Sequence, residues 1–198
     1  MPKQCAFCGT RSLPGDTSIC GGCYEDLPWA IGQKSIPPLV CAIAKLTYAF
    51  PIDAAIKAMK FNRRLDYVPV FADLLLNSMA DLPDDIDALL PVPLHWRRQA
   101  ARGFNQAEEL CKPLMRHTGL AMLSNVKRTR ATPYQSALDA GHRHRNLESA
   151  FAVRGEVGAR HVLIVDDVIT TGETCGKLAQ VLLENGAQRV SVLAIARA

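Results

Sequence analysis

The chain has 198 residues, of which 48% are hydrophobic and 21% are charged, and its formal net charge is +4. This length supports one well-packed domain with a small appendage, and the composition excludes a disordered or fibrous protein. No apolar run is long enough to span a bilayer, and no basic-then-apolar export signal opens the sequence. We therefore expect a cytoplasmic protein that does not insert into membranes.

Charge is unevenly distributed along the chain. Four aspartates form an acidic patch over 81–87, arginines cluster over 97–102, and a longer basic region covers 127–145. Two basic patches on a nearly balanced chain predict local anion sites, not a surface that coats nucleic acid uniformly.

Two CxxC pairs, eleven residues apart, lie near the N-terminus and comprise Cys5, Cys8, Cys20 and Cys23. Two such pairs predict a closed tetrahedral site for structural Zn²⁺. The alternatives are reduced structural thiols and redox-active CxxC pairs, but the latter belong beside a βαβ pattern that this segment lacks. The other cysteines, Cys41, Cys111 and Cys175, are expected to be small buried side chains.

Hydrophobic periodicity predicts the remaining elements in chain order. We expect strands over 39–50, 86–92, 121–126, 151–153, 161–165 and 189–195. We expect helices over 52–59, 67–79, 105–116 and 172–184, an Arg-rich turn before the third helix, and a long polar loop over 127–146. This alternation predicts an α/β domain over 29–198, whose mostly parallel sheet has helices on both faces, after a zinc-binding module over 1–28.

The stretch VLIVDDVITTGET, residues 162–174, combines an apolar strand, the acidic pair Asp166 and Asp167, and a turn that opens a helix. Ligands of open α/β sheets lie beyond the carboxyl ends of the strands, where the strand would deliver these acids. The unpaired N–H groups and dipole of a first helical turn suit a phosphate. The candidate phosphate ligands are Thr170, Thr171, Gly172, Glu173 and Thr174.

Acids beside an anion site require a ligand that is anionic at one end and rich in hydroxyl groups or metal at the other. A phosphorylated sugar fits, with its phosphate on the turn and its hydroxyls or Mg²⁺ at Asp166 and Asp167. The stretch is neither a Walker loop nor a GxGxxG fingerprint. The alternative is a helix cap that follows a buried strand, with two incidental acids.

This stretch resembles the phosphoribosyl-diphosphate (PRPP) signature of type I phosphoribosyltransferases. The CxxC pairs, PVPL at 91–94, RGFNQA at 102–107, and a basic segment with Gln135 and Arg145 extend the likeness over essentially the whole chain. Together they make the chain similar to the ComF/GntX family of competence-associated, phosphoribosyltransferase-like proteins.

The resemblance implies a type I phosphoribosyltransferase-like fold that binds PRPP with Mg²⁺, in which Asp166 and Asp167 hold the ribose. It implies that an early loop holds the diphosphate, and the candidates there are Leu94, Arg97, Arg98, Arg102 and Gly103. A solvated basic turn is the alternative for that loop.

Two functions are compatible with this family resemblance. The protein would transfer phosphoribosyl from PRPP to an unknown acceptor, with release of diphosphate, or it would bind PRPP or a nucleotide as a non-catalytic sensor or adaptor. Either form would act in natural transformation, with single-stranded DNA and competence proteins such as a helicase as partners.

The basic loop over 127–146 has three interpretations: a hood that closes over PRPP, a nucleic-acid contact, or a solvated loop. Its candidate residues are Arg128, Arg130, Gln135 and Arg145. The five histidines show no ligand spacing, so we expect surface or loop residues and assign no general base. These histidines are His95, His117, His142, His144 and His161.

Overall fold

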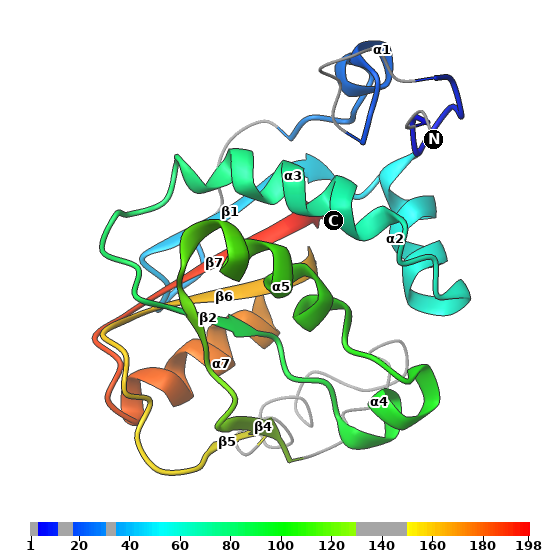
Figure 1. The fold of residues 1–198 in the computed structure, drawn as a ribbon. Helices are drawn as coiled ribbons and strands as arrows, with labels where there is room; N and C mark the ends of the chain where they lie inside the picture. The colour runs from blue at the N-terminus through cyan, green and yellow to red at the C-terminus, as the bar shows by residue number, and fades with distance from the viewer. Residues whose placement is uncertain (1–3, 12–17, 31–34, 130–149) are drawn as a thin grey trace.

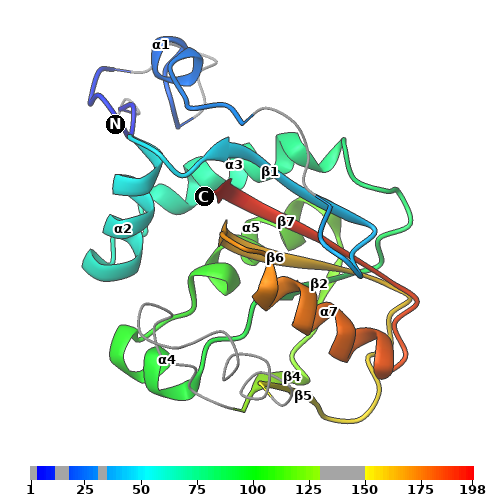
Figure 2. The ribbon, with the colours of Figure 1, turned by 180° about the vertical axis from the view of Figure 1, so that it is seen from behind.

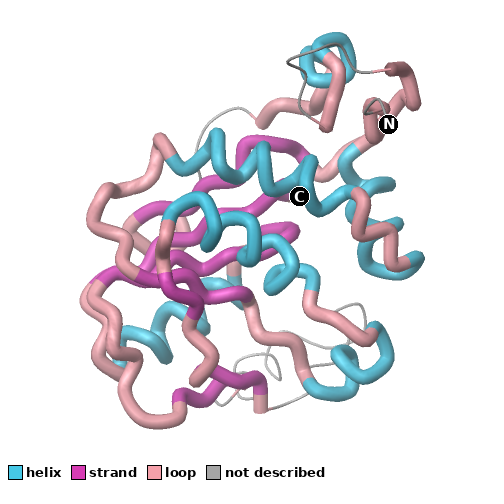
Figure 3. Tube along the Cα trace, in the orientation of Figure 1, coloured by secondary structure: helices cyan, strands magenta, loops and turns pink. Residues whose placement is uncertain are grey.

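The computed structural model describes residues 4–11, 18–30, 35–129 and 150–198. Its centre is a five-stranded parallel sheet in the order β1-β7-β6-β2-β3, and a separate antiparallel pair joins β4 to β5 (Figures 1 and 3). The strands are β1 (Cys41–Thr47), β2 (Ala88–Pro91), β3 (Ala121–Met122), β4 (Val126–Arg128), β5 (Phe151–Val153), β6 (His161–Ile169) and β7 (Arg189–Arg197). The helices are α1 (Gly21–Glu25), α2 (Ile52–Asn62), α3 (Tyr67–Met79), α4 (Trp96–Arg102), α5 (Gln106–Thr118) and α7 (Glu173–Glu184).

Helices cover both faces of the sheet, as the sequence predicts. Helices α3 and α5 lie on one face and α7 on the other, which the opposed views show directly (Figures 1 and 2). Side chains of β6 alternate between the two layers because successive residues of a strand point to opposite faces. Leu163 packs with Phe71 and Leu110 in one core cluster, whereas Ile164 packs with Leu178 in the other.

Several element boundaries differ from the expectation. Strand β6 continues past Val165 to Ile169, because β7 runs on to Arg197 and keeps pairing with it, so the acidic pair lies within the strand. The expected Arg-rich turn forms a short helix, α4, capped by the His95 ring at its start and by Gly103 (φ 79°) at its end. The single strand expected over 121–126 is two short ones, β3 and β4, and β4 takes Arg128 out of the expected loop.

The cysteine segment packs against the sheet domain. Cys5, Ile19 and Leu27 belong to the same buried cluster as Phe71 of α3, and the rings of Phe7 and Tyr67 lie 6.0 Å apart. The connector that follows runs antiparallel to the edge strand β1. Two backbone hydrogen bonds join the connector to β1: Ala30 N donates to Lys45 O and Thr47 N donates to Pro28 O, both at 2.7 Å.

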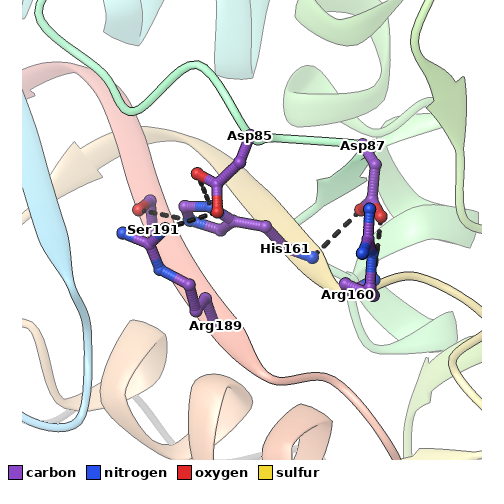
Figure 4. Close-up of polar contacts among 6 residues, drawn as sticks. All are labelled: Asp85, Asp87, Arg160, His161, Arg189 and Ser191. Carbon is purple, nitrogen blue, oxygen red and sulfur yellow. Dashed lines mark hydrogen bonds and ion pairs between the residues drawn. The ribbon is translucent and has the colours of Figure 1, made fainter.

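The amino ends of the strands are fastened by a polar network that accounts for much of the acidic patch (Figure 4). His161 Nδ1 lies 2.7 Å from Asp85 Oδ1, and its Nε2 lies 2.9 Å from Ser191 Oγ. Arg189 also contacts Asp85. The Asp87 carboxylate accepts the N–H groups of Arg160 and His161, at 2.9 and 3.0 Å. The network therefore ties the segment before β2 to β6 and β7.

Two histidines are buried, contrary to the expectation of surface or loop positions. His95 is 5% exposed and His161 is 1% exposed. Both rings have hydrogen-bonding partners that offset the cost of burial, which a search for metal-ligand spacing does not detect. Among the residues that the structure describes, no helix is long and apolar enough to cross a membrane.

Candidate functional site

A cavity of about 370 Å³ lies at the carboxyl ends of the central strands, and residues of α2, α4 and the start of α5 line it. It brings together both aspartates of the PRPP-like stretch and two arginines of the second loop, although 64 residues of sequence separate Arg102 from Asp166. Its charged lining residues are Lys57, Lys60, Arg98, Arg102, Arg128, Asp166 and Asp167. Cations outnumber acids, so the cavity favours an anionic ligand that also offers groups to carboxylates.

The acidic pair reaches the cavity because β2 is shorter than β6. The last paired residue of β2 is Pro91, opposite Val165, and Val92 N donates to Val165 O at 2.9 Å. Beyond this point β6 is paired on its β7 side only, so Asp166 and Asp167 lie where β2 no longer covers the strand. This step between neighbouring strands is a common location for ligand sites in open parallel sheets.

The two carboxylates have different environments. Asp167 is 8% exposed, and its Oδ1 lies 2.7 Å from the Lys60 ammonium of α2. Asp166 Oδ1 accepts the backbone N–H of Asp167 at 2.8 Å. Burial, followed by the charge of Asp167, raises the pKa of Asp166 to about 7. A carboxyl group whose pKa is near neutrality is present in both its protonated and its ionised form close to pH 7. It can therefore donate a proton in one form and bind a hydroxyl group or a metal ion in the other.

The second loop contributes its residues unequally. Leu94, Arg98 and Arg102 line the cavity, whereas the Arg97 guanidinium lies over the exposed Trp96 ring at 5.2 Å. Gly103 does not face open space, because a side chain there would collide with the Arg63 guanidinium.

Helix α4 starts from a neutral imidazole. His95 Nδ1 accepts the N–H of Arg97 at 3.3 Å, which caps the helix. Burial, then the charges of Arg97, Arg128 and Arg98, lowers the pKa of His95. A lowered pKa preserves the unprotonated nitrogen that the cap requires.

The residues of the turn between β6 and α7 do not all line the same cavity. Thr174 lines the cavity with the acidic pair, whereas Thr170 lines a different one beside Trp29 and Ile36. Glu173 pairs with Lys177 at 3.0 Å. Thr171 Oγ1 accepts the Glu173 N–H at 3.3 Å.

Gly172 is close-packed by the protein itself. Its φ of 81° is a left-handed conformation that favours glycine, and a Cβ there would lie 2.7 Å from Ile36 Cδ1. The group that lies close to Gly172 is therefore the Ile36 side chain. Phosphate binding by the turn remains a prediction, and of its five candidate residues only Thr174 lines this cavity.

Of the basic-loop candidates, Arg128 is described, whereas Arg130, Gln135 and Arg145 lie outside the described residues. Arg128 is part-buried on β4, lines the cavity, and stacks over the Phe151 ring at 5.5 Å. Burial, then the charge of Arg98, lowers its pKa.

Sequence reasoning missed several cavity residues, among them Lys60 and Gln106. Lys60 directly follows the helix expected over 52–59, and its side chain reaches a carboxylate 107 positions away. Gln106 lies near the start of the helix expected over 105–116, and its side chain is 2% exposed. Nothing in the linear pattern reports either contact, because each depends on how α2 and α5 pack beside β6.

The four predicted cysteine ligands converge. The sulfurs of Cys5, Cys8, Cys20 and Cys23 all lie within 4.8 Å of one another. Cys8 Sγ and Cys20 Sγ are 3.7 Å apart, close to the separation of about 3.8 Å that follows from tetrahedral bonds of about 2.3 Å to zinc. Hydrogen bonds with Thr10 lower the pKa of Cys8 to about 6, whereas burial raises the pKa of Cys23, so the case for a metal site rests on the positions of the four sulfurs. These cysteines are positioned to bind a metal ion.

The isolated cysteines behave mostly as predicted. Cys111 and Cys175 are buried, and burial raises the pKa of both thiols. Cys41 is only part-buried at the edge strand, so it departs from the expectation.

The fold and its cavity define a parallel α/β protein with an anion-attracting site at the carboxyl edge and an N-terminal cysteine cluster. No family model matches the chain. It is 38% identical over 207 residues to DNA utilization protein YhgH of Escherichia coli strain K12, covering 98% of this chain and 89% of that protein. It is 35% identical over 204 residues to Competence protein F of Haemophilus influenzae, covering 98% and 84%. The chain belongs to the ComF family of competence-related proteins, which confirms the resemblance.

Solved structures similar to this chain include two phosphoribosyltransferase-related enzymes. Glutamine PRPP amidotransferase of Bacillus subtilis matches with a TM-score of 0.44 and 19% identity, covering 69% of this chain and 30% of that chain. Orotate phosphoribosyltransferase of Aeropyrum pernix matches with a TM-score of 0.38 and 18% identity, covering 65% and 70%. At these values the likeness carries no conclusion about ligand or reaction.

Proposed function

We propose that this protein binds PRPP together with Mg²⁺ in the cavity at the carboxyl edge of the sheet. The observation that carries the proposal is the convergence of Asp166 and Asp167 with Arg98, Arg102 and Arg128 around one cavity. PRPP has a phosphate, a diphosphate and a ribose ring between them, so it needs cationic donors at its ends and hydroxyl acceptors in its middle. The lining supplies both kinds of group.

Within this proposal each part of the ligand has a matching part of the cavity. Asp166 and Asp167 accept from the ribose hydroxyls or share the Mg²⁺ ion, because carboxylate oxygens are the donors that Mg²⁺ prefers. Thr174, in the first turn of α7, binds the 5-phosphate. Arg98 and Arg102 bind the diphosphate. When the ligand binds, Lys60 must either release the Asp167 carboxylate or stay paired with it and add positive charge next to the ligand.

The chemistry that such a site supports is pentosyl transfer. The bond between ribose C1 and the diphosphate oxygen breaks as a bond from C1 to an acceptor forms, and the electron pair leaves with the diphosphate. Positive charge develops on the sugar, where the nearby carboxylates stabilise it, while the arginines stabilise the departing diphosphate. Mg²⁺ held by Asp166 and Asp167 would supply further positive charge. Binding of PRPP without turnover, as a sensor or adaptor, uses the same contacts.

The decisive experiment is a calorimetric titration of Mg²⁺–PRPP into wild-type protein and into Asp166→Ala/Asp167→Ala. We expect measurable binding by the wild type and a loss of at least about 100-fold in the double variant, because two charge-assisted contacts are removed. Asp84→Asn is the matched control, since Asp84 is an exposed aspartate far from the cavity. Equal affinities in all three proteins would exclude this site. Diphosphate release in the presence of candidate acceptors then separates a transferase from a sensor.

We further propose that the protein acts in the cytoplasm in natural transformation, where it handles single-stranded DNA with partners such as a helicase. The names of its relatives, Competence protein F and DNA utilization protein YhgH, support this role. The cysteine cluster would hold structural zinc as a folded module for a partner or for DNA, since four thiolates leave no coordination position for catalysis.

One structural feature favours a DNA contact beside the cavity, which Phe61 and Arg102 also line. Phe61 and Trp96 are 65% and 64% exposed, and an arginine guanidinium lies over each ring, Arg102 at 5.3 Å and Arg97 at 5.2 Å. Exposed rings beside cations are the usual means of stacking unpaired bases and binding their phosphates.

We expect Trp96→Ala/Phe61→Ala to weaken binding of a labelled oligonucleotide about tenfold, measured by fluorescence anisotropy at two salt concentrations. Phe50→Ala serves as the control, because Phe50 is more exposed, at 80%, and no arginine is recorded over its ring among the described residues. Unchanged affinity in the double variant would remove these rings from the DNA proposal.

A further inference from the structure

Gln106, the first residue of α5, has a buried side chain with an unused hydrogen-bond donor. The residue is 2% exposed, it lines the cavity, and its Nε2 has no hydrogen-bond partner among the residues that the structure describes. Leaving a buried donor unpaired lowers the stability of the folded protein. Native proteins seldom accept this cost without a functional reason, so the amide is a candidate for a ligand contact.

The neighbouring Asn105 has no such spare capacity. Its Nδ2 donates to Val92 O at 3.1 Å, and its Oδ1 accepts the N–H of Ala107 at 3.1 Å. Asn105 therefore caps the helix and fixes it to the end of β2. Fixing residue 105 in this way holds Gln106 in a constant position at the cavity wall. Asn105 therefore has a structural role, whereas the amide of Gln106 has a donor that no described residue uses.

The surroundings of Gln106 indicate the ligand group that it would meet. The unpartnered atom is a donor, so its partner must be an acceptor, and the cations Arg98, Arg102 and Arg128 line the same cavity. An oxyanion satisfies all of these donors at once. The helix dipole alone would not carry the argument, because Glu108 and Glu109 already place negative charge in the first turn of α5. The specific signal is the neutral amide.

The position on the sheet distinguishes the two anionic ends of the proposed ligand. Helix α5 contacts β2 and β6 on one face of the sheet, whereas α7, which carries Thr174, lies on the opposite face (Figures 1 and 2). Gln106 also follows directly on the segment that carries Arg98 and Arg102. We propose that Gln106 Nε2 donates a hydrogen bond to a phosphoryl oxygen of the diphosphate group, and not to the 5-phosphate. This inference rests on the proposed function and assigns one more binding residue to it.

The test is calorimetric titration of inorganic diphosphate, ribose 5-phosphate and PRPP, each with Mg²⁺, into wild-type protein, Gln106→Leu and Gln106→Glu. We expect Gln106→Leu to weaken binding of diphosphate and PRPP about tenfold, and Gln106→Glu to weaken it about 100-fold, because the carboxylate repels the anion. Binding of ribose 5-phosphate should change less than twofold. Gln99→Leu is the matched control, since Gln99 is an exposed glutamine on α4.

Thermal unfolding of the ligand-free variants supplies the second readout. Because Nε2 makes no hydrogen bond in the free protein, Gln106→Leu should unfold at the same temperature as wild type or higher, while it binds diphosphate less well. A lower unfolding temperature with equal losses for all three ligands would show a structural residue and overturn the inference. Wild-type affinity of Gln106→Leu for diphosphate would also overturn it.

The outcome separates the inference from the function on which it rests. If the wild type binds diphosphate in a Gln106-dependent way but does not bind PRPP, the inference holds and the proposed function fails. If the wild type binds PRPP and the Gln106 variants bind it equally well, the proposed function holds and the inference fails. If the wild type binds none of the ligands, both fail.

Discussion

Aspartates lie at both ends of β6, in opposite circumstances. At the amino end, Asp85 and Asp87 are held by His161, Arg189 and backbone N–H groups (Figure 4). At the carboxyl end, Asp166 and Asp167 lie side by side, and the pKa of Asp166 is raised to about 7 through burial and then the charge of Asp167. The first arrangement stabilises the fold, whereas the second costs stability, as groups kept for ligand binding often do.

The pKa directions express the same contrast. The hydrogen bond from His161, opposed by partial burial and aided by Arg189, lowers the pKa of Asp85. Asp85 therefore stabilises the fold above its ordinary pKa, and this contribution is lost as the pH falls through its lowered pKa. Asp166 behaves in the opposite sense. The aspartate at the amino end of β6 thus has a lowered pKa, and the one at its carboxyl end has a raised pKa.

The amino-end network also resembles the Asp-His-Ser order of hydrolases, and burial decides against that role. His161 bridges Asp85 and Ser191 at 2.7 and 2.9 Å, but Ser191 has no exposed surface. A nucleophile must reach its substrate, so this serine cannot attack one. The arrangement is a structural fastening, and any test of it should read stability.

Of the variants that test this difference between the two ends of β6, His161→Leu should change the stability most. This change removes two hydrogen bonds and leaves the Ser191 hydroxyl buried without its partner. We expect the free energy of unfolding to fall by about 3 kcal/mol, measured by urea denaturation. The affinity for PRPP should not change once folding is complete, since the network lies at the opposite end of the sheet from the cavity. Lost binding in the folded variant would contradict the separation of the two ends.

A smaller effect of opposite sign is expected from Asp166→Asn. Between pH 4 and 7 the unfolded chain loses the Asp166 proton while the folded chain keeps it, so wild-type stability falls as the pH rises through this range. The asparagine variant lacks this penalty and should be about 2 kcal/mol more stable at pH 8, after discounting for partial exposure. Urea denaturation at pH 5 and pH 8 measures the difference, which should be small at pH 5. No gain at pH 8 would show that the pair is not destabilising.

The smallest effect is expected from Lys60→Met, which removes the ammonium from Asp167. We expect a loss of about 1 kcal/mol, because the pair is part-buried but solvent still reaches it. Lys57→Met on the same helix is the matched control. Lys57 pairs with Asp53 at an exposed position, so its loss should lower the stability much less. Equal losses in the two variants would mean that Lys60 has no special relation to the acidic pair.

The sequence predicted the parts of this molecule that depend on local pattern. Helix α3 begins and ends as periodicity indicates, at Tyr67 and Met79, and the CxxC spacing correctly brings four sulfurs together. The acidic pair and the Arg-rich segment meet because the carboxyl ends of parallel strands share one edge, which the order of strands and helices implies. These features need no knowledge of how distant side chains pack.

The missed features depend on contacts between distant segments. The ion pair of Lys60 with Asp167, the unpaired amide of Gln106 and the two bonds of the His161 ring all arise after the helices and strands pack. A histidine that opens an apolar strand has the same pattern whether it is exposed or bridges two neighbours. The length of β6 was also misjudged, because it depends on where β7 ends, not on the residues of β6 itself.

The connector beside β1 has a consequence for self-association. Its backbone contacts with Lys45 and Thr47 occupy hydrogen-bonding groups along one outer margin of the sheet, and the chain on its N-terminal side leads into the cysteine cluster. Loosening that cluster would release the connector and leave a bare strand margin able to recruit another polypeptide. A metal ion bound by the four cysteines would therefore keep the edge strand β1 covered and prevent it from pairing with another chain.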